Sequence, residues 1–381
     1  MKFFSVAALL LVFLASCSSN PESLQSPLSN GPYVGRQTTN SMMVWARTEV
    51  PAQFHVKYGT HKGKYISSTS PVMTKLENDN TGTVSLKGLK PGTRYYYAVF
   101  SGTKQVSPEG TFKTLRDSEL LKSKLNPKGL FNFSFEFACG NNQGIAGSLG
   151  PALPAFKTLN EKFRDDLDFA ILNGDWLYEE ARDYTPEQWM KQVNADKLPK
   201  LVDIAPTITG VWENYKVYMN RGKNINEWHR NIPSYFTFDD HEILNDVIGT
   251  GTIGFRNRRP VFRDIAVEAW YDYLGWANHT ATKQPIHFGK AELKAGSDIL
   301  TDKSADFTKI DLKQAATLLV HWGTKNAGVK NIPEGDVKGG HPNSKVYKIV
   351  KVLDKNRVQI SPPAVKTDTN SYSIGRRSYS D

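Results

Sequence analysis

Cysteine is nearly absent from this sequence, since only Cys17 and Cys139 occur among its 381 residues. If the first of them is lipidated or lost with a leader segment, the second has no partner. No intrachain disulfide is therefore expected in the mature protein. A lone thiol outside the cytoplasm is open to oxidation unless it is buried or bound to a metal. We therefore expect Cys139 to be either buried or bound to a metal.

Dense basic blocks and long apolar runs are lacking too. The apolar run from Val6 to Leu14 is too short to cross a membrane as a helix. The 48 Lys+Arg against 38 Asp+Glu give a formal net charge of +10, but the basic residues are scattered. Because nucleic-acid binding needs clustered basic residues, no nucleic-acid partner is expected. The length allows two or three globular domains.

The first twenty residues are typical of a targeting segment, with Lys2 before the apolar run. Leu14-Ala15-Ser16-Cys17 resembles a bacterial lipoprotein signal, in which Cys17 carries the lipid. The protein would then be exported and anchored to the membrane of the cell envelope, in the periplasm or at the cell surface. The alternative is an ordinary secretory signal with an incidental cysteine. Residues 21–29 are rich in Ser and Pro and are predicted to form a linker.

Residues 30–115 show the short alternating runs of half-buried strands. Strands are predicted at 41–47, 53–58, 82–86 and 95–100. Pro91-Gly92 forms a turn before a run of tyrosines that can pack inward and bond to the backbone. The pattern predicts an all-β, fibronectin type III-like sandwich with Trp45 in its core.

Residues 130–290 alternate between strands and helices. Strands are predicted at 131–138, 167–172 and 232–238, with helices at 151–163, 212–218 and 264–274. A strand-helix-strand unit places its two strands parallel, so their carboxyl ends share one edge of the sheet. Ligands bind at that edge in open α/β sheets.

The three strands end in side chains that bind metals: Cys139, then Asp175, then Asp239-Asp240-His241. Taken alone, each has a simpler explanation. Cys139 could be a small buried residue, Tyr178 could pack in the core, and the aspartates could cap a helix. Their order and spacing favour a metal site.

The order β-sandwich, strand-Cys139, Gly174-Asp175-Trp176-Leu177-Tyr178-Glu179 and Asp239-Asp240-His241-Glu242 with a following Asn resembles the PhoD-type alkaline phosphatases. These are a branch of the calcineurin-like metallophosphoesterases, and the resemblance covers residues 30–290. It implies an α/β metallophosphoesterase core and hydrolysis of phosphate mono- or diesters by a metal-activated hydroxide. Two metals bridged by a carboxylate suit that chemistry.

The resemblance also implies residue roles. Cys139 and Tyr178 would bind ferric iron, Fe(III), and Asp175 would bridge it to calcium, Ca(II). Asp240 would bind the second metal, and His241 would act as the catalytic histidine. A further set would supply metal or phosphate contacts: Asn141, Asp239, Asn245 and Arg256. Arg258, Arg259 and Arg263 follow Arg256, where the alternative is a solvated basic loop.

Two other functions stay open. One is a non-catalytic surface lipoprotein that binds a partner and keeps a partial metal site. The other is a phospholipase D-like activity on lipid headgroups. Residues 299–375 are predicted to form a small β-rich insert in which His321 and His341 are structural or exposed. The later histidine motifs of the resembling family are not found, so we expect a partial core and a C-terminally truncated chain.

Overall fold

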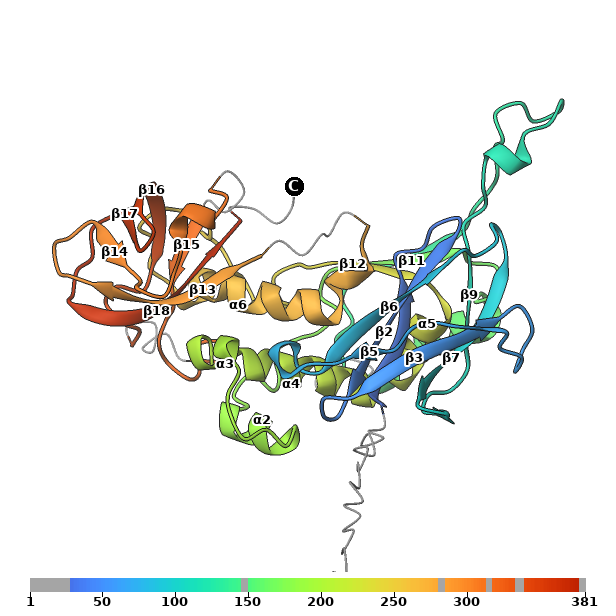
Figure 1. The fold of residues 1–381 in the computed structure, drawn as a ribbon, viewed down its shortest axis with the longest axis horizontal. Coiled ribbons are helices and arrows are strands. Elements are labelled where there is room, and N and C mark those ends of the chain that lie inside the picture. Colours follow the sequence, from blue (N-terminus) through green and yellow to red (C-terminus); the bar gives the residue numbers. More distant parts are fainter. Residues whose placement is uncertain (1–27, 145–149, 280–284, 313–316, 333–338, 377–381) are drawn as a thin grey trace, which may run out of the picture.

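The computed structural model describes residues 28–376 except 145–149, 280–284, 313–316 and 333–338. Cys17 and the predicted targeting segment lie outside the described residues. Within the described part, none of the helices is long and apolar enough to cross a membrane. Figure 1 shows the amino-terminal β module at one end, a small β-barrel at the other, and the helical core between them.

The amino-terminal module contains two antiparallel sheets that share an apolar core. The four predicted strands are confirmed to within one residue. The first strand was missed: it begins at Leu28, so the module takes two residues of the predicted linker. The first sheet is made of β1 (Leu28–Gly35), β2 (Ser41–Thr48) and β6 (Thr81–Lys87). The second is made of β3 (Gln53–Gly59), β4 (Ser67–Ser68), β5 (Val72–Met73), β7 (Arg94–Ser101), β8 (Lys104–Gln105) and β9 (Gly110–Lys113).

Trp45 does not pack inside the module, and the prediction that it does is wrong. Successive residues of a strand face opposite sides of a sheet, and Val44 takes the side that faces the second sheet. Trp45 therefore faces the α/β core, where its Nε1 donates a hydrogen bond of 2.8 Å to the Asp272 carbonyl. Its ring stacks on Trp276, with 6.4 Å between centroids. Trp45 thus joins the two domains.

A buried charge network holds the same two domains together. Asp79, fully buried in the module, accepts two hydrogen bonds from Arg47. It also accepts hydrogen bonds from Trp189 Nε1 and from the Tyr273 hydroxyl of the core. The Lys216 ammonium lies 3.6 Å from its Oδ2. Three elements of the core therefore converge on one carboxylate of the module.

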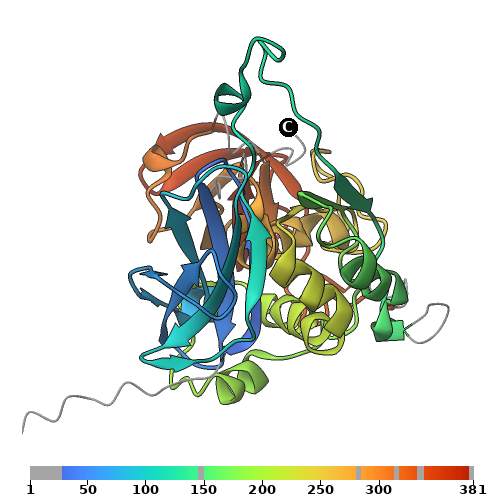
Figure 2. The same ribbon diagram turned by 90° about the vertical axis from the view of Figure 1, so that its right-hand side faces the viewer.

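The core contains a three-stranded parallel sheet in the order β10-β11-β12. Among the described residues, the first two strands are joined by one α-helix and the last two by four, as predicted for strand-helix-strand units. The strands are β10 (Phe135–Ala138), β11 (Phe169–Asn173) and β12 (Ser234–Thr237). The helices are α1 (Pro154–Lys162), α2 (Pro186–Gln192), α3 (Lys200–Ile204), α4 (Ile208–Arg221), α5 (Lys223–Asn231) and α6 (Arg258–Tyr273). Figure 2 shows the helices and the β module from the side.

The two faces of this sheet differ in burial. Leu172 and Phe236 belong to the main hydrophobic core, which the helices complete. The other face carries an aromatic row that includes Phe135 and Phe137, which are 47% and 60% exposed. Phe135 stacks on Phe169 with 5.3 Å between ring centroids. The predicted alternation of this segment is confirmed, although the strand begins at 135 rather than 131.

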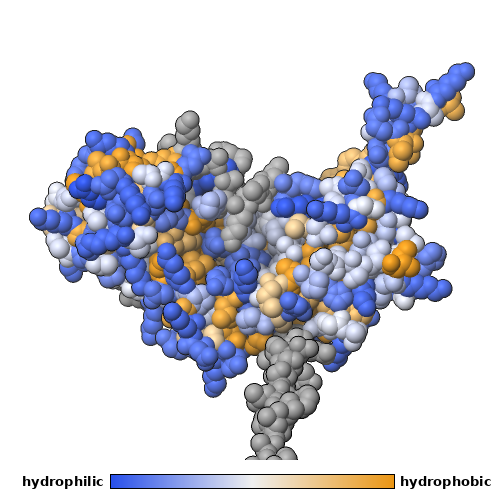
Figure 3. Space-filling model, in the orientation of Figure 1, coloured by the Kyte–Doolittle hydropathy of each residue, from blue (hydrophilic) through white to orange (hydrophobic). Residues whose placement is uncertain are grey.

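The carboxyl-terminal part forms a closed six-stranded barrel in the order β13-β14-β17-β16-β15-β18. The predicted insert, 299–375, is corrected at its start, because β13 pairs with β18 over seven residues and belongs to the barrel. The strands are β13 (His287–Leu293), β14 (Ile299–Thr301), β15 (Thr317–Val320), β16 (Val346–Asp354), β17 (Arg357–Ser361) and β18 (Asp368–Gly375). Figure 3 shows an apolar patch over this end of a largely hydrophilic face.

Candidate metal centre

The three predicted strand ends meet at one edge of the sheet. Ala138 lies beside Leu172, and Asn173 lies beside Thr237, in parallel register. The loops that follow β10, β11 and β12 therefore start side by side. The Asn141 amide confirms this by donating a 2.8 Å hydrogen bond to the Asp175 carbonyl.

The turn after β11 has a backbone that few residues can adopt. Gly174 has φ +82°, and a Cβ there would lie 2.6 Å from the Cβ of Asp239, so only glycine lets the two loops approach. Asp175 itself has φ +52°, in the left-handed region that costs a non-glycine residue about 1 kcal/mol. Such strain persists where surrounding contacts enforce it, and it is concentrated at functional sites.

Glu242 supplies those contacts. Its buried carboxylate accepts hydrogen bonds from the backbone amides of Asp175, Trp176 and Asp239. Burial raises the pKa of Glu242 to about 7, against the lowering effect of these amides. One side chain therefore fixes the loops after β11 and β12 relative to each other.

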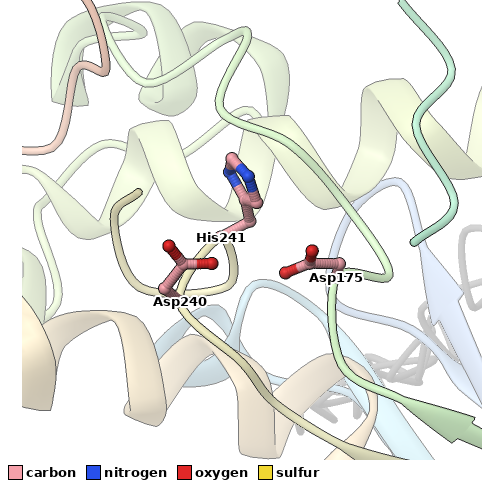
Figure 4. Close-up of side chains that lie close together, drawn as sticks. All are labelled: Asp175, Asp240 and His241. Carbon is pink, nitrogen blue, oxygen red and sulfur yellow. The ribbon is translucent and has the colours of Figure 1, made fainter. Parts of the chain in front are cut away.

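Asp175, Asp240 and His241 form a cluster whose ligand atoms all lie within 4.8 Å of one another. It is the one such group of three found among the described residues. In Figure 4 the two carboxylates face each other and the imidazole lies beside them. Asp175 Oδ1 is buried and has no hydrogen-bond partner among the residues that the structure describes. A buried carboxylate oxygen without a partner is unusual, and a cation would satisfy it.

Charge at the cluster is consistent with a bound cation. Burial raises the pKa of Asp175, and the carboxylates of Asp240 and Asp239 raise it further, while His241 lowers it. Crowded carboxylates repel one another, and a shared cation removes that repulsion. The residues present therefore fit a metal ion.

Tyr178 and Cys139 lie next to this cluster. The Tyr178 hydroxyl donates to Asp175 Oδ2 over 3.3 Å, and its ring centroid is 4.0 Å from that of His241. Burial and the Asp175 charge raise the pKa of both side chains. The Cys139 thiol is exposed. Their role as iron ligands stays a prediction.

Three of the four other residues predicted to contact metal or phosphate lie around the cluster. Asn141 is buried with its Nδ2 unpaired, and Asp239 is exposed at the same edge of the sheet. The Asn245 amide donates to Glu179, and its side chain donates to Asp246. These residues surround the cluster.

Arg256, the fourth residue predicted to contact metal or phosphate, contacts Gly340 and Trp322 instead. Its guanidinium donates to the carbonyl of Gly340 over 2.9 Å and lies 4.6 Å from the centre of the Trp322 ring. Arg258 and its neighbours do not form a basic loop, because α6 begins at Arg258 and includes Arg259 and Arg263. Arg258 is buried and bonds the carbonyls of 327 and 330.

Two side chains at the centre were missed by the sequence analysis. Glu179 Oε2 lies 2.7 Å from His241 Nδ1, and its place within the Gly174–Glu179 motif was a signal for it. Lys330 Nζ lies 5.6 Å from the centre of the Tyr178 ring. No pattern in the sequence pointed to Lys330, which comes from the segment between two barrel strands.

Two models of known protein families match the chain. Residues 15–116 match the model of the N-terminal domain of PhoD-like phosphatases, and residues 135–296 match the PhoD-like phosphatase model. The chain belongs to the PhoD-like phosphatase family. The second match contains Cys139, Asp175, Tyr178, Asp240 and His241. Among curated protein sequences, no significant match is found.

Solved structures are similar to the chain at low identity. A structure described as PhoD is 18% identical, covers 70% of this chain and 50% of its own, and has a TM-score of 0.49. A purple acid phosphatase from yellow lupin (Lupinus luteus) seeds is 15% identical over 65% of this chain and 40% of its own, with a TM-score of 0.39. The chain thus spans half the length of the PhoD structure that it matches.

Proposed function

We propose that this chain hydrolyses phosphoric esters at a metal centre held by Asp175 and Asp240, with His241 beside them as the catalytic histidine. The observation that carries the proposal is the cluster of their ligand atoms within 4.8 Å at the carboxyl ends of β11 and β12. The family relationship supports the reaction class. The unpaired, buried Asp175 Oδ1 supports metal binding.

The donor set suggests which ions would bind. Asp175 and Asp240 offer the carboxylate oxygens that calcium prefers. Tyr178 and Cys139 ionise with difficulty, so they suit a trivalent ion such as ferric iron. When bound, the metals would neutralise charge on the phosphoryl group and lower the pKa of water.

The chain's own residues would position and protonate the substrate. Glu179 holds His241 Nδ1, which leaves Nε2 to face the phosphoryl group or to protonate the leaving oxygen. The Lys330 ammonium, beside Tyr178, would attract the anionic substrate. Glu242 would keep the loops in place through its three backbone contacts.

The test is the initial rate with p-nitrophenyl phosphate for the wild-type chain and for Asp175→Asn, each supplied with iron and calcium. Removing the proposed bridging charge should lower kcat by at least about a hundredfold. Asp196→Asn is the matched control, since Asp196 is exposed on the loop between α2 and α3. Wild-type rate and metal content in Asp175→Asn would contradict the proposal.

The substrate class is decided by comparing a monoester, a diester and a lipid. Rates with p-nitrophenyl phosphate, bis(p-nitrophenyl) phosphate and phosphatidylcholine vesicles distinguish phosphatase, phosphodiesterase and phospholipase D-like activity. In the alternative function, the fibronectin III-like module binds a partner and catalysis is lost. That alternative predicts a folded chain without iron, and a partner that is captured by residues 30–115 alone.

We also propose that the protein is exported and anchored by lipid on Cys17. The evidence is the signal pattern that ends at this cysteine. Expression of the full chain in a bacterium, followed by membrane fractionation and intact mass measurement, tests this proposal. Cys17→Ala should release the protein from the membrane fraction, and an unchanged distribution would contradict the anchor.

A further inference from the structure

Arg182 is a buried cation to which the proposed reaction gives no task. It follows Glu179 in the loop after β11 and is 2% exposed. Its hydrogen-bond partners among the described residues are all neutral oxygen atoms, one from a side-chain amide and three from backbone carbonyls. A charged group is rarely buried unless hydrogen bonds replace the water that it loses. These four bonds therefore account for the burial of Arg182.

Three of the bonds reach consecutive carbonyls of the turn after β12. Arg182 Nη1 donates to the Ile243 carbonyl over 2.9 Å. Its Nη2 donates to the carbonyls of His241 and Glu242 over 3.1 and 3.2 Å. Among side chains, only arginine has a flat fork of five donors that can bind adjacent carbonyls together. The guanidinium therefore fixes the backbone that carries Asp240 and His241.

The fourth bond links Arg182 to the loop after β11 through Asn214 of α4. Asn214 Oδ1 accepts a 2.9 Å bond from Arg182 Nε and a 3.1 Å bond from the Glu180 amide. Its Nδ2 donates to the Tyr178 carbonyl over 3.0 Å. Asn214 is fully buried. The backbone on both sides of Glu179 is thus tied to the same guanidinium that holds the turn after β12.

Close packing against α4 holds the backbone of Arg182 in place. A Cβ on Gly210 would lie 2.3 Å from the Arg182 carbonyl oxygen, so only glycine lets the loop approach the helix so closely. The guanidinium carbon also lies 6.0 Å from the centre of the Phe262 ring of α6. A side chain that orients a functional site has to be supported by rigid elements, and here two helices provide that support.

We propose that Arg182, together with Asn214, positions the two loops of the metal centre and so sets the spacing of Asp175 from Asp240 and His241. Arg182 is a positioning residue, because it contacts backbone carbonyls and an amide rather than the side chains of the cluster. Glu242 holds the same two loops by their amides, whereas Arg182 holds them by carbonyls. The inference rests on the proposed function, since the spacing matters only if the cluster binds metal and substrate.

Arg182→Lys tests the inference, because lysine keeps the charge but lacks the fork of donors. One measurement is calorimetric titration of the metal-free chain with Ca²⁺. The other is kcat and KM for p-nitrophenyl phosphate with iron and calcium supplied. Loss of a residue that orients metal ligands weakens metal affinity or activity by about 10–100-fold. We expect a change of that size in kcat and in the Kd for Ca²⁺, with KM changed by less than about threefold.

Arg47→Lys is the matched control. Arg47 is also 2% exposed, but it lies in the β module and pairs with Asp79. Its replacement should lower the thermal unfolding midpoint and leave kcat and the affinity for Ca²⁺ unchanged. The comparison separates a loss of stability from a loss of position, so equal losses of kcat in the two variants would overturn the inference.

A second variant guards against a folding failure of Arg182→Lys. Asn214→Asp keeps the oxygen that accepts from Arg182 and from the Glu180 amide, but it removes the donor to the Tyr178 carbonyl. The new carboxylate would pair with the buried guanidinium, so we expect a folded chain. Its kcat should be lower by about tenfold.

The outcomes distinguish this inference from the proposed function. Wild-type kcat and Ca²⁺ affinity in a folded Arg182→Lys overturn the positioning role alone. If Arg182→Lys does not fold, the same result in Asn214→Asp overturns it. A wild-type chain that neither binds Ca²⁺ nor hydrolyses p-nitrophenyl phosphate overturns the proposed function, and the inference with it.

Discussion

Glu179 Oε2 lies 2.7 Å from Nδ1 of His241, and both side chains are largely buried. Although burial raises the pKa of Glu179, the hydrogen bond from His241 and the nearby Arg182 charge hold it below its usual value. Glu179 is therefore an ionised acceptor that fixes the ring orientation of His241. A carboxylate behind a histidine sets which nitrogen faces the reaction.

Glu179→Gln tests this role. Glutamine keeps the shape but removes the charge, so kcat for p-nitrophenyl phosphate should fall by about 10–100-fold with little change in KM. Glu180→Gln is the control, because Glu180 is the next residue but pairs with Arg221 on the surface. A Glu179→Gln variant with wild-type kcat would show that His241 needs no such support.

Lys330→Ala tests whether the ammonium near Tyr178 attracts the substrate. Losing one positive charge at the site should raise KM by about tenfold and make the rate less sensitive to salt. Lys348→Ala, on an exposed position of β16, should leave KM unchanged. Equal KM values for wild type and Lys330→Ala would remove Lys330 from the binding site.

Asp79→Asn tests the charge network between the β module and the core. The variant leaves the buried Arg47 and Lys216 without their carboxylate, which should cost about 3–5 kcal/mol in the free energy of unfolding. Urea denaturation measures this change. Asp354→Asn breaks an exposed ion pair with Arg357 and should have no measurable effect. Similar denaturation curves for the two variants would contradict the proposed importance of the network.

The burial of His229 should make the free energy of unfolding depend on pH. Its Nε2 accepts a hydrogen bond from Trp176 Nε1, and burial lowers its pKa to about 3. As the pH falls, His229 becomes protonated near pH 6.5 in the unfolded chain, but only near pH 3 in the folded chain. The stability that His229 contributes is therefore complete above pH 6.5 and is lost as the pH falls toward 3.

His229→Gln should consequently make the fall in stability below pH 6.5 shallower by about 1.4 kcal/mol per pH unit. Urea denaturation at a series of pH values between 7 and 4 measures the slope. His61→Gln, at an exposed position, should keep the wild-type slope. If His229→Gln kept that slope as well, His229 would not be the titrating group.

Local patterns were enough to predict most of the elements near the centre. The alternation around Phe135 and the apolar run before Asn173 predicted two parallel strands, and both are present. The order of the motifs placed Asp175, Asp240 and His241 together, because parallel strands end at one edge. The N-terminal strand was missed and the start of the barrel was misplaced, since the pairing of both depends on strands distant in the sequence.

Contacts between distant segments could not be predicted. Trp45 fits either face of its sheet by pattern alone, and only the packed core shows which face meets Trp276. Lys330 reaches Tyr178 because Arg258 holds the intervening loop by its carbonyls. No local periodicity encodes such contacts, so residues of this kind need a structure.

The most direct test of the metal centre is elemental analysis of the purified chain, grown with iron and calcium. We expect about one iron per chain, with a visible charge-transfer band from Tyr178 or Cys139. Asp175→Asn should lose the metal, and Asp196→Asn should retain it. A folded wild-type chain that contains neither iron nor any other metal would contradict the central claim.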